Sequence, residues 1–383
     1  MRVSTDIPSF MDPNERKKVC VWVVNAQSRH LSPAQAAERI AMIVRVTLPF
    51  APDLYYKKTD SVLRGNIGAE IESLMKAVGA QNACFAPAFP ENGRTTKKGV
   101  QYVHGVPLDK TIFGRDPFEP VKHSDVRAVI AEQSTTPVVL AQDKCPDEGI
   151  ALFGAETNSD MRAAAQVMRA NDVRVLAGCA GLASVLAEVY ELDQGNFSQP
   201  FLPQRMIVLS GSLHPVTARQ LHYARHHGIN GITLSTEQLY CPHYLDTPPG
   251  ISFGRQMAEW ARRQQHLLIE AASLAANNIN SSDITREIVA NNIGALGCAL
   301  IRTKIPAVYV LTGGDTLMAV MQQLGSATLR PITEILPGVV LSETVIDGQT
   351  LFIISKSGGF GPDDVFLQII AYLKEHAEGG QTA

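Results

Sequence analysis

The sequence lacks the segments that direct a chain to a membrane or anchor it there. Residues 1–14 are polar, without the apolar core of a signal peptide, and no run of 18 apolar residues occurs anywhere. With 34 Lys and Arg against 37 Asp and Glu, the chain also lacks the basic excess of nucleic-acid-binding proteins. These absences predict a cytoplasmic protein that binds neither membranes nor nucleic acid.

Cysteine and histidine are sparse and scattered. The six cysteines include no Cys-x-x-C pair, which excludes zinc-finger and thioredoxin motifs and a disulfide framework. We expect free structural thiols in a reducing compartment, with Cys20, Cys84 and Cys298 in apolar surroundings. The histidines show no metal-ligand spacing, so no metal-binding residue is predicted, and surface or helix-capping roles are expected for His104, His123 and His214.

Short β-branched runs alternate with amphipathic segments along most of the 383 residues. This pattern predicts an α/β protein of two domains, each a mostly parallel sheet flanked by helices, with an active-site cleft between them. The domains are expected at 1–195 and 205–383, joined by a polar, proline-bearing linker at 196–204. In the first domain we expect strands at 19–24, 54–56, 82–87, 136–141 and 174–177, and helices at 33–46, 65–78 and 180–189. Ser32 is expected as the N-cap of the first helix, with Pro33 at its first position. In the second we expect strands at 206–209, 232–234, 307–311 and 351–354, helices at 215–225 and from 362, and a long helical middle at 254–302.

Three glycine-bearing loops follow strands in the second half. They are Ser210-Gly-Ser212, Thr312-Gly-Gly-Asp-Thr316 and Lys356-Ser-Gly-Gly-Phe-Gly361. Glycine lets a backbone approach a ligand, and the N–H groups at the start of the next helix attract phosphate. A single such loop is usually a tight turn, but three in one domain favour a nucleotide pocket, in which Asp315 faces either a magnesium ion or a ribose. The P-loop and dinucleotide fingerprints are both absent.

A charged turn occupies residues 57–66, between a predicted strand and a helix. It gathers two lysines, a carboxylate, two hydroxyls and an arginine, which suits the binding of a polyhydroxy acid. Arg29 and Arg94 follow two other predicted strands and are expected at the same sheet edge. The simpler alternative is a solvated loop in which Ser61 or Asn66 caps the helix.

Together these motifs resemble the four-carbon acid sugar kinase family, formerly the domain of unknown function 1537. The resemblance rests on Lys-Lys-x-Asp-Ser-x-x-Arg-Gly-Asn-Ile-Gly at 57–68, Gly-Arg-Thr-Thr at 93–96, Gly-x-Ala-Gly-Leu at 178–182, Ser-Gly-Ser at 210–212, Thr-Gly-Gly-Asp-Thr at 312–316, Pro-Gly at 337–338 and Lys-Ser-Gly-Gly-Phe-Gly at 356–361. It implies an N-terminal acid-sugar domain, a C-terminal ATP domain, and ATP- and Mg²⁺-dependent phosphorylation of the terminal hydroxyl of D-threonate, D-erythronate or 3-oxo-tetronate.

The resemblance also assigns roles to residues. Substrate contacts are expected from Arg29, Lys58, Thr59, Asp60, Ser61, Arg64 and Arg94. ATP contacts are expected from Ser212, Gly313, Gly314, Asp315, Thr316, Gly358 and Gly359. Asp60 is the candidate for orienting the substrate hydroxyl or taking its proton.

The sequence departs from the family pattern in two places. The family opens with a strand and Asp-Asp-x-Thr-Gly, whose aspartate contacts the acid, and this motif does not occur here. Only residues 142–149 join two predicted strands, whereas parallel crossovers need a dozen or more residues. The family has a helix at that crossover, and an aspartate where Gly154 stands.

These departures support a second hypothesis, that the chain is a catalytically impaired family member that binds nucleotide without turnover. An exposed sheet edge at the missing strand would favour pairing with a second copy of the chain, so a homodimer is one expected assembly. An unrelated nucleotide-dependent oxidoreductase is the third alternative, and the missing dinucleotide fingerprint counts against it.

Overall fold

The computed structural model describes residues 2–4, 20–115, 120–192, 199–212, 214–271, 283–325 and 328–377, with the backbone alone at 2–4 and 283–286. The chain divides into two compact units. One comprises Phe10–Cys20 and Val24–Gln194, and we call it the N-terminal unit. The other, the C-terminal unit, comprises Gly195–Ala383 together with Met1–Ser9 and Val21–Val23.

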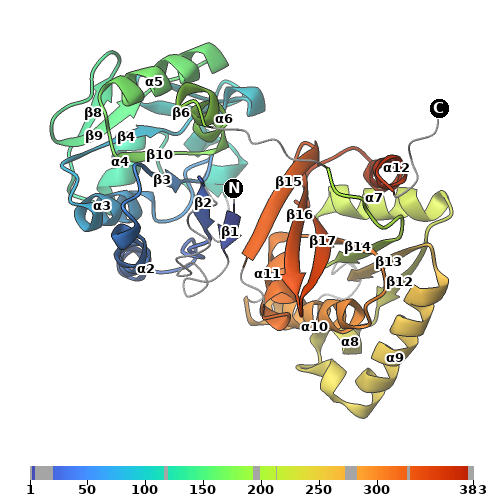
Figure 1. The fold of residues 1–383 in the computed structure, drawn as a ribbon. Helices are drawn as coiled ribbons and strands as arrows, with labels where there is room; N and C mark the ends of the chain where they lie inside the picture. The colour runs from blue at the N-terminus through green and yellow to red at the C-terminus, as the bar shows by residue number, and fades with distance from the viewer. Residues whose placement is uncertain are drawn as a thin grey trace. The chain divides into compact units, whose positions relative to one another are not determined.

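The N-terminal unit is built on a five-stranded, wholly parallel sheet in the order β3-β10-β4-β9-β8. Its strands are β3 (Tyr55–Lys58), β4 (Asn82–Ala86), β8 (Val138–Ala141), β9 (Gly149–Phe153) and β10 (Val175–Gly178). One face packs on α2 (Pro33–Thr47), α3 (Ile67–Val78) and α4 (Val126–Ala131), and the other on α5 (Asn158–Ala170) and α6 (Ala180–Val189) (Figure 1). A small antiparallel sheet is formed by β5 (Arg94–Lys97), β6 (Val100–Val103) and β7 (Val106–Pro107). Short 3-10 turns lie at Leu48–Phe50, Pro90–Asn92, Leu108–Lys110 and Ile112–Arg115.

The C-terminal unit carries a sheet in the order β12-β13-β11-β14-β17-β16-β15-β1-β2. Five strands are parallel: β11 (Met206–Ser210), β12 (Asn230–Leu234), β13 (His266–Ala271), β14 (Val308–Thr312) and β17 (Gln349–Lys356). Antiparallel pairing then adds β16 (Val339–Ile346), β15 (Thr328–Leu336) and β1 (Arg2–Ser4), with β2 (Trp22–Val24) at the edge. One face packs on α7 (Pro215–His226) and α12 (Val365–Glu375). The other packs on α8 (Thr236–Tyr240), α9 (Pro248–Arg263), α10 (Asp283–Arg302) and α11 (Gly314–Gln323), and a 3-10 turn lies at Tyr244–Asp246.

The start of α2 shows how local sequence sets an element. Ser32 is the N-cap, its hydroxyl accepts from the Gln35 N–H, and the Gln35 side chain accepts from the Ser32 N–H in return. Pro33 takes the first helical position, where its missing N–H costs nothing. The helix predicted here from the Ser-Pro pair is therefore confirmed.

Two predictions about elements are wrong, and two long strands were missed. The strand predicted at 19–24 reduces to β2, which lies at the edge of the C-terminal unit's sheet with Val23 39% exposed, instead of being buried in the first domain. The predicted helical middle contains β13, because the short apolar run Leu267–Ile269 is equally compatible with either element. The antiparallel strands β15 and β16 were not predicted at all.

All six cysteines are free, as expected, but Cys20 is exposed instead of buried. The apolar residues that follow Cys20 form the edge strand β2, and none of its three residues is fully buried. The Sγ atoms of Cys84 and Cys145 lie 2.9 Å apart.

The connection between β8 and β9 is unusually short. The two strands pair in parallel although only residues 142–148 join them. The return is feasible because β8 has only four residues, so the chain travels back along a short strand. Val139 and Leu140 on this edge strand are 47% and 45% exposed.

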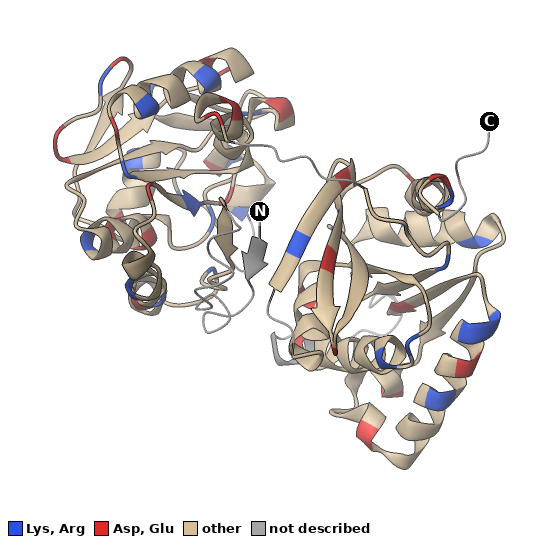
Figure 2. Cartoon of the chain, in the orientation of Figure 1, with Lys and Arg blue, Asp and Glu red and all other residues tan. Residues whose placement is uncertain are grey.

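Charges of both signs are interspersed over the helices of each unit, as along α9 (Figure 2). Within the described ranges, we find no helix with the length and apolar character needed to span a bilayer.

Candidate active site

The charged turn is organised around Asp60, just after β3. One carboxylate oxygen, Oδ2, accepts from Arg29 Nη2 at 3.1 Å and from Arg64 Nη2 at 3.0 Å. The other, Oδ1, accepts from the Val62 N–H at 2.8 Å. The Asp60 side chain is 10% exposed, whereas those of Arg29 and Arg64 are 44% and 27% exposed. Each guanidinium therefore keeps N–H donors for a ligand while the carboxylate fixes its position.

Helix α3 holds the segment that carries Arg29. The Asn66 side-chain amide donates to the backbone carbonyls of Ser28 and Leu31, at 2.9 and 2.8 Å. Glu70 accepts from the Ser28 hydroxyl and forms an ion pair with Lys57 at 2.9 Å. Asn66 takes the N-cap position without a side-chain capping bond, so its amide is committed to this clamp. Arg29 thus reaches Asp60 although β2 lies outside this sheet.

The other residues of the turn differ in their availability. Lys58 is exposed and forms no ion pair with any described residue. Thr59 is 3% exposed, and its hydroxyl has no hydrogen-bond partner in the described structure. The Ser61 carbonyl accepts from Gln101 Nε2 at 3.1 Å, which ties the turn to β6. Lys58 is therefore the cation of the turn with most freedom to meet a ligand.

Arg94 lies at the start of β5, in the small antiparallel sheet. Its guanidinium donates to the Asn92 carbonyl, and its Nε is buried without a partner. Gln101 links this sheet to the charged turn, because it accepts from the Thr96 hydroxyl at 2.5 Å as well as donating to Ser61. The structure joins Arg29, Asp60 and Arg64 by direct contact and places Arg94 on a neighbouring hairpin.

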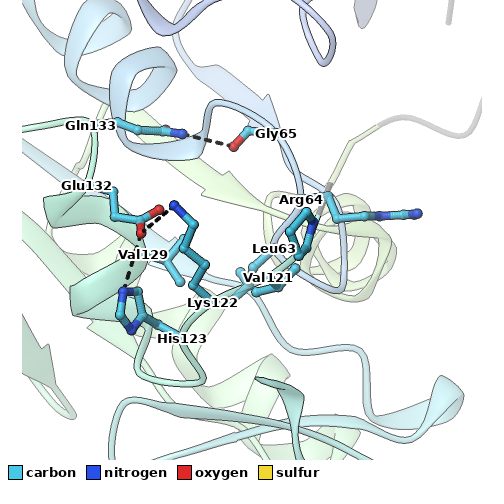
Figure 3. Close-up of a pocket in the computed structure, with 10 residues that line it drawn as sticks. Leu63, Arg64, Gly65, Val121, Lys122, His123, Val129, Glu132 and Gln133 are labelled. Carbon is cyan, nitrogen blue, oxygen red and sulfur yellow. Dashed lines mark hydrogen bonds and ion pairs between the residues drawn. The ribbon is translucent and has the colours of Figure 1, made fainter. Parts of the chain in front are cut away.

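A pocket of about 270 Å³ opens beside the turn, lined by Leu63, Gly65, Lys122, His123, Glu132 and Gln133 among others. Figure 3 shows Lys122 and His123 directed at Glu132, with Nζ and Nε2 lying 3.7 and 3.3 Å from Oε1. The Arg64 side chain points away from this group (Figure 3). Lys122 and His123 thus share one carboxylate, and Arg64, which pairs with Asp60, also lines this pocket.

The three glycine loops of the C-terminal unit touch one another. The Gly211 N–H donates to the Thr316 hydroxyl at 3.2 Å, and the Thr217 hydroxyl donates to the Gly358 carbonyl at 2.7 Å. Gly313 N–H donates to the Lys356 carbonyl at 2.9 Å. A Cβ at Gly358 would lie 2.3 Å from Ser212 Oγ, so the close approach of these two loops requires glycine there. The loops predicted separately from the sequence therefore form one surface.

The middle loop presents a helix N-terminus. Gly313 has φ +100°, a conformation that favours glycine, and α11 begins at the next residue. Gly314 has open space where a Cβ would be, and Asp315 is exposed beside it. Thr316 is buried against the first loop. Free N–H groups at this end of α11 suit a phosphate.

Two further side chains shape the loops: Gln220, which was not predicted, and His214. Gln220 Nε2 lies within 3.0 Å of the carbonyls of Phe360, Gly361 and Pro362, so α7 holds the third loop. His214 caps α7 by accepting from the Val216 N–H, which confirms the capping role expected for it. Glu70 and Gln101 were also missed, since single polar residues at helical or strand positions carry no local signal.

The described residues contain no group of three or more His, Cys, Asp or Glu side chains that could hold a metal ion.

Comparison with known proteins follows the same division. A sugar-binding N-terminal domain model matches residues 3–186, and a nucleotide-binding C-terminal domain model matches residues 207–366. Relatives include D-threonate kinases of Salmonella typhimurium, 30% identical over 97% of this chain and 93% of the relative, and of Bordetella bronchiseptica, 28% identical over 96% and 89%. A D-erythronate kinase of Heliobacterium modesticaldum is 24% identical over 97% and 91%.

Solved structures share the fold. A crystal structure from Salmonella typhimurium LT2 has a TM-score of 0.80 at 21% identity, covering 96% of this chain and 92% of that one. A Haemophilus influenzae protein has a TM-score of 0.73 at 20% identity, with 92% and 90% covered. The two domain models and the kinase relatives agree along nearly the whole chain, which belongs to the four-carbon acid sugar kinase family, a family of sugar-acid kinases.

Proposed function

We propose that this protein transfers the terminal phosphate of ATP to the terminal hydroxyl of a four-carbon sugar acid. The observation that carries the proposal is the Arg29–Asp60–Arg64 cluster, a pair of partly exposed guanidiniums fixed by one nearly buried carboxylate. It lies in the unit that the sugar-binding model matches. D-threonate is the first acid to test, because relatives 30% and 28% identical are D-threonate kinases.

Arg29 and Arg64 would bind the carboxylate of the acid with the N–H groups that Asp60 leaves free. Lys58 would add a third positive charge from its exposed position. Thr59, Ser61 and Arg94 are proposed to contact the hydroxyls of the acid. Asp60 Oδ1 has one lone pair beyond its bond to the Val62 N–H, and with it Asp60 would orient a hydroxyl or take its proton.

The nucleotide would lie on the glycine loops of the C-terminal unit. Ser212, Gly358 and Gly359 come from the first and third loops, and Gly313 to Thr316 supply the start of α11. Loop amides and the helix N-terminus would hold the phosphates, and Mg²⁺ bound to them would neutralise developing charge. Phosphoryl transfer depends mainly on such positioning, so no covalent intermediate on the protein is required.

The test measures ATP consumption with D-threonate, D-erythronate and 3-oxo-tetronate in turn, and ATP binding separately by calorimetry. The proposal predicts ATP binding and consumption that depends on one of the acids. ATP binding with no turnover of any acid would instead support the impaired relative. The absence of any nucleotide binding would contradict both.

A further inference from the structure

The end of β17 places a lysine beneath the glycine loops. Lys356 is 2% exposed, and its Nζ donates to the Ser357 carbonyl at 2.9 Å. No carboxylate among the described residues comes within ion-pair distance of it. An ammonium buried without a carboxylate partner is costly, and such groups usually mark a site where an anion is expected.

Two more buried polar groups stand beside it. Ser210, Thr312 and Lys356 are the last residues of β11, β14 and β17 and are register partners across these adjacent strands. Register partners in parallel strands point to the same face. The hydroxyl oxygens of Ser210 and Thr312 are buried without a hydrogen-bond partner among the described residues. Three neighbouring strands therefore end in one ammonium and two hydroxyls whose bonding is incomplete.

The charged and titratable groups of the surrounding elements do not compensate the ammonium. They are His214 before α7, Arg219, His222, Arg225 and His226 on α7, Asp315 on α11, Arg330 and Glu334 on β15, Glu343 on β16, Asp363 and Asp364 before α12, and Lys374 and Glu375 at its end. Arg219 pairs with Asp363, and Arg330 with Glu343. Burial alone lowers the pKa of Lys356, to about 8.

We propose that Lys356 is a phosphate-binding residue of the nucleotide site, supplying the positive charge beneath the glycine loops. The Ser357 carbonyl that its Nζ contacts belongs to the third loop, and the Lys356 carbonyl accepts from Gly313 of the second. The Lys356 ammonium thus contacts the third loop, and the Lys356 backbone contacts the second. The inference rests on the proposed function, because it needs a nucleotide on these loops.

Such a lysine couples nucleotide binding to protons. Phosphate charge nearby favours the ammonium and raises the Lys356 pKa in the complex above its value of about 8 in the free protein. Binding is then strongest below pH 8 and weakens as the pH rises through 8 toward the pKa of the complex. For each unit by which the Lys356 pKa in the complex exceeds that in the free protein, ATP affinity falls about tenfold as the pH rises across that range.

The experiment measures binding of MgATP, ADP and AMP by calorimetry in two buffers of different ionisation enthalpy. At a pH of about 8.5, imidazole and phosphate groups no longer titrate. We expect wild-type protein to take up protons on binding ATP. K356M should abolish the proton uptake. It should lower the affinity most for ATP, less for ADP and least for AMP. The control K374M replaces an exposed lysine on α12 and should behave as wild type.

The outcomes separate the two proposals. ATP binding without proton uptake, or an equal loss for all three nucleotides in K356M, would show that Lys356 only supports the loop. No ATP binding by the wild-type protein would overturn the proposed function as well. If K356M does not fold, proton uptake by the wild-type protein still tests the proposal. A lysine that stays neutral or stays charged on ATP binding takes up no proton.

Discussion

Asp60 bridges two arginines that come from separate segments of the chain, with its Oδ2 at 3.1 Å from Arg29 and 3.0 Å from Arg64. Asn at this position would keep the shape but remove the charge that both guanidiniums share. If Asp60 positions the arginines, D60N should raise KM for the acid. If Asp60 takes the hydroxyl proton, D60N should lower kcat by about 100-fold or more with KM little changed.

Steady-state kinetics on D60N distinguish these roles. D143N, which alters an exposed aspartate in the same unit, is the matched control. Full turnover with an unchanged KM in D60N would remove Asp60 from the site.

Glu70 forms a largely buried ion pair with Lys57. Its side chain is 6% exposed and pairs with Lys57, itself 15% exposed, while it also binds Ser28. E70Q leaves the Lys57 ammonium largely buried without a counter-charge, so we expect unfolding free energy to fall by about 3 kcal/mol. Urea denaturation measures the loss. The exposed pair Lys97–Glu156 provides the control, and E156Q should change stability by less than about 0.5 kcal/mol.

Among the elements, α10 and α11 pack unusually closely. A Cβ at Gly294 of α10 would lie 2.7 Å from the Cβ and 2.8 Å from the carbonyl carbon of Ala319 in α11. G294A should therefore push α11, the helix that begins at the middle glycine loop, away from α10. We expect the free energy of unfolding to fall by about 1–3 kcal/mol and nucleotide binding to weaken.

G254A in α9 is the matched substitution, since the nearest atom to its added Cβ is 3.7 Å away. Alanine there should stabilise the helix by about 0.5–1 kcal/mol. Thermal melts with and without ATP compare the two variants. Equal effects at both positions would contradict the packing argument.

Elements with strong local signals could be predicted from the sequence. The Ser32–Pro33 cap located α2 within a residue of its observed start, and β11 and β14 were found from their apolar runs. Elements defined by distant partners could not. β2 looks like a core strand but pairs at the edge of another sheet, and β15 and β16 gain stability from each other and from β17.

At the scale of the whole molecule, the motifs placed the family correctly: the sugar-binding model matches residues 3–186 and the nucleotide-binding model residues 207–366. The candidate site was predicted by residue type and position at strand ends. Its internal bonding was not, because Glu70 and Lys356 owe their importance to burial, and burial depends on the complete fold.

Sugar-acid kinase activity would be established by identifying the product formed from ATP and D-threonate, with D-erythronate and 3-oxo-tetronate assayed alongside. Phosphorus NMR should show ADP and one phosphate ester at the terminal hydroxyl in equal amounts, formed only when the acid is present. ATP hydrolysis at the same rate without any acid, or ATP binding with no ester formed from any of the three, would show that the protein is not a kinase of these acids.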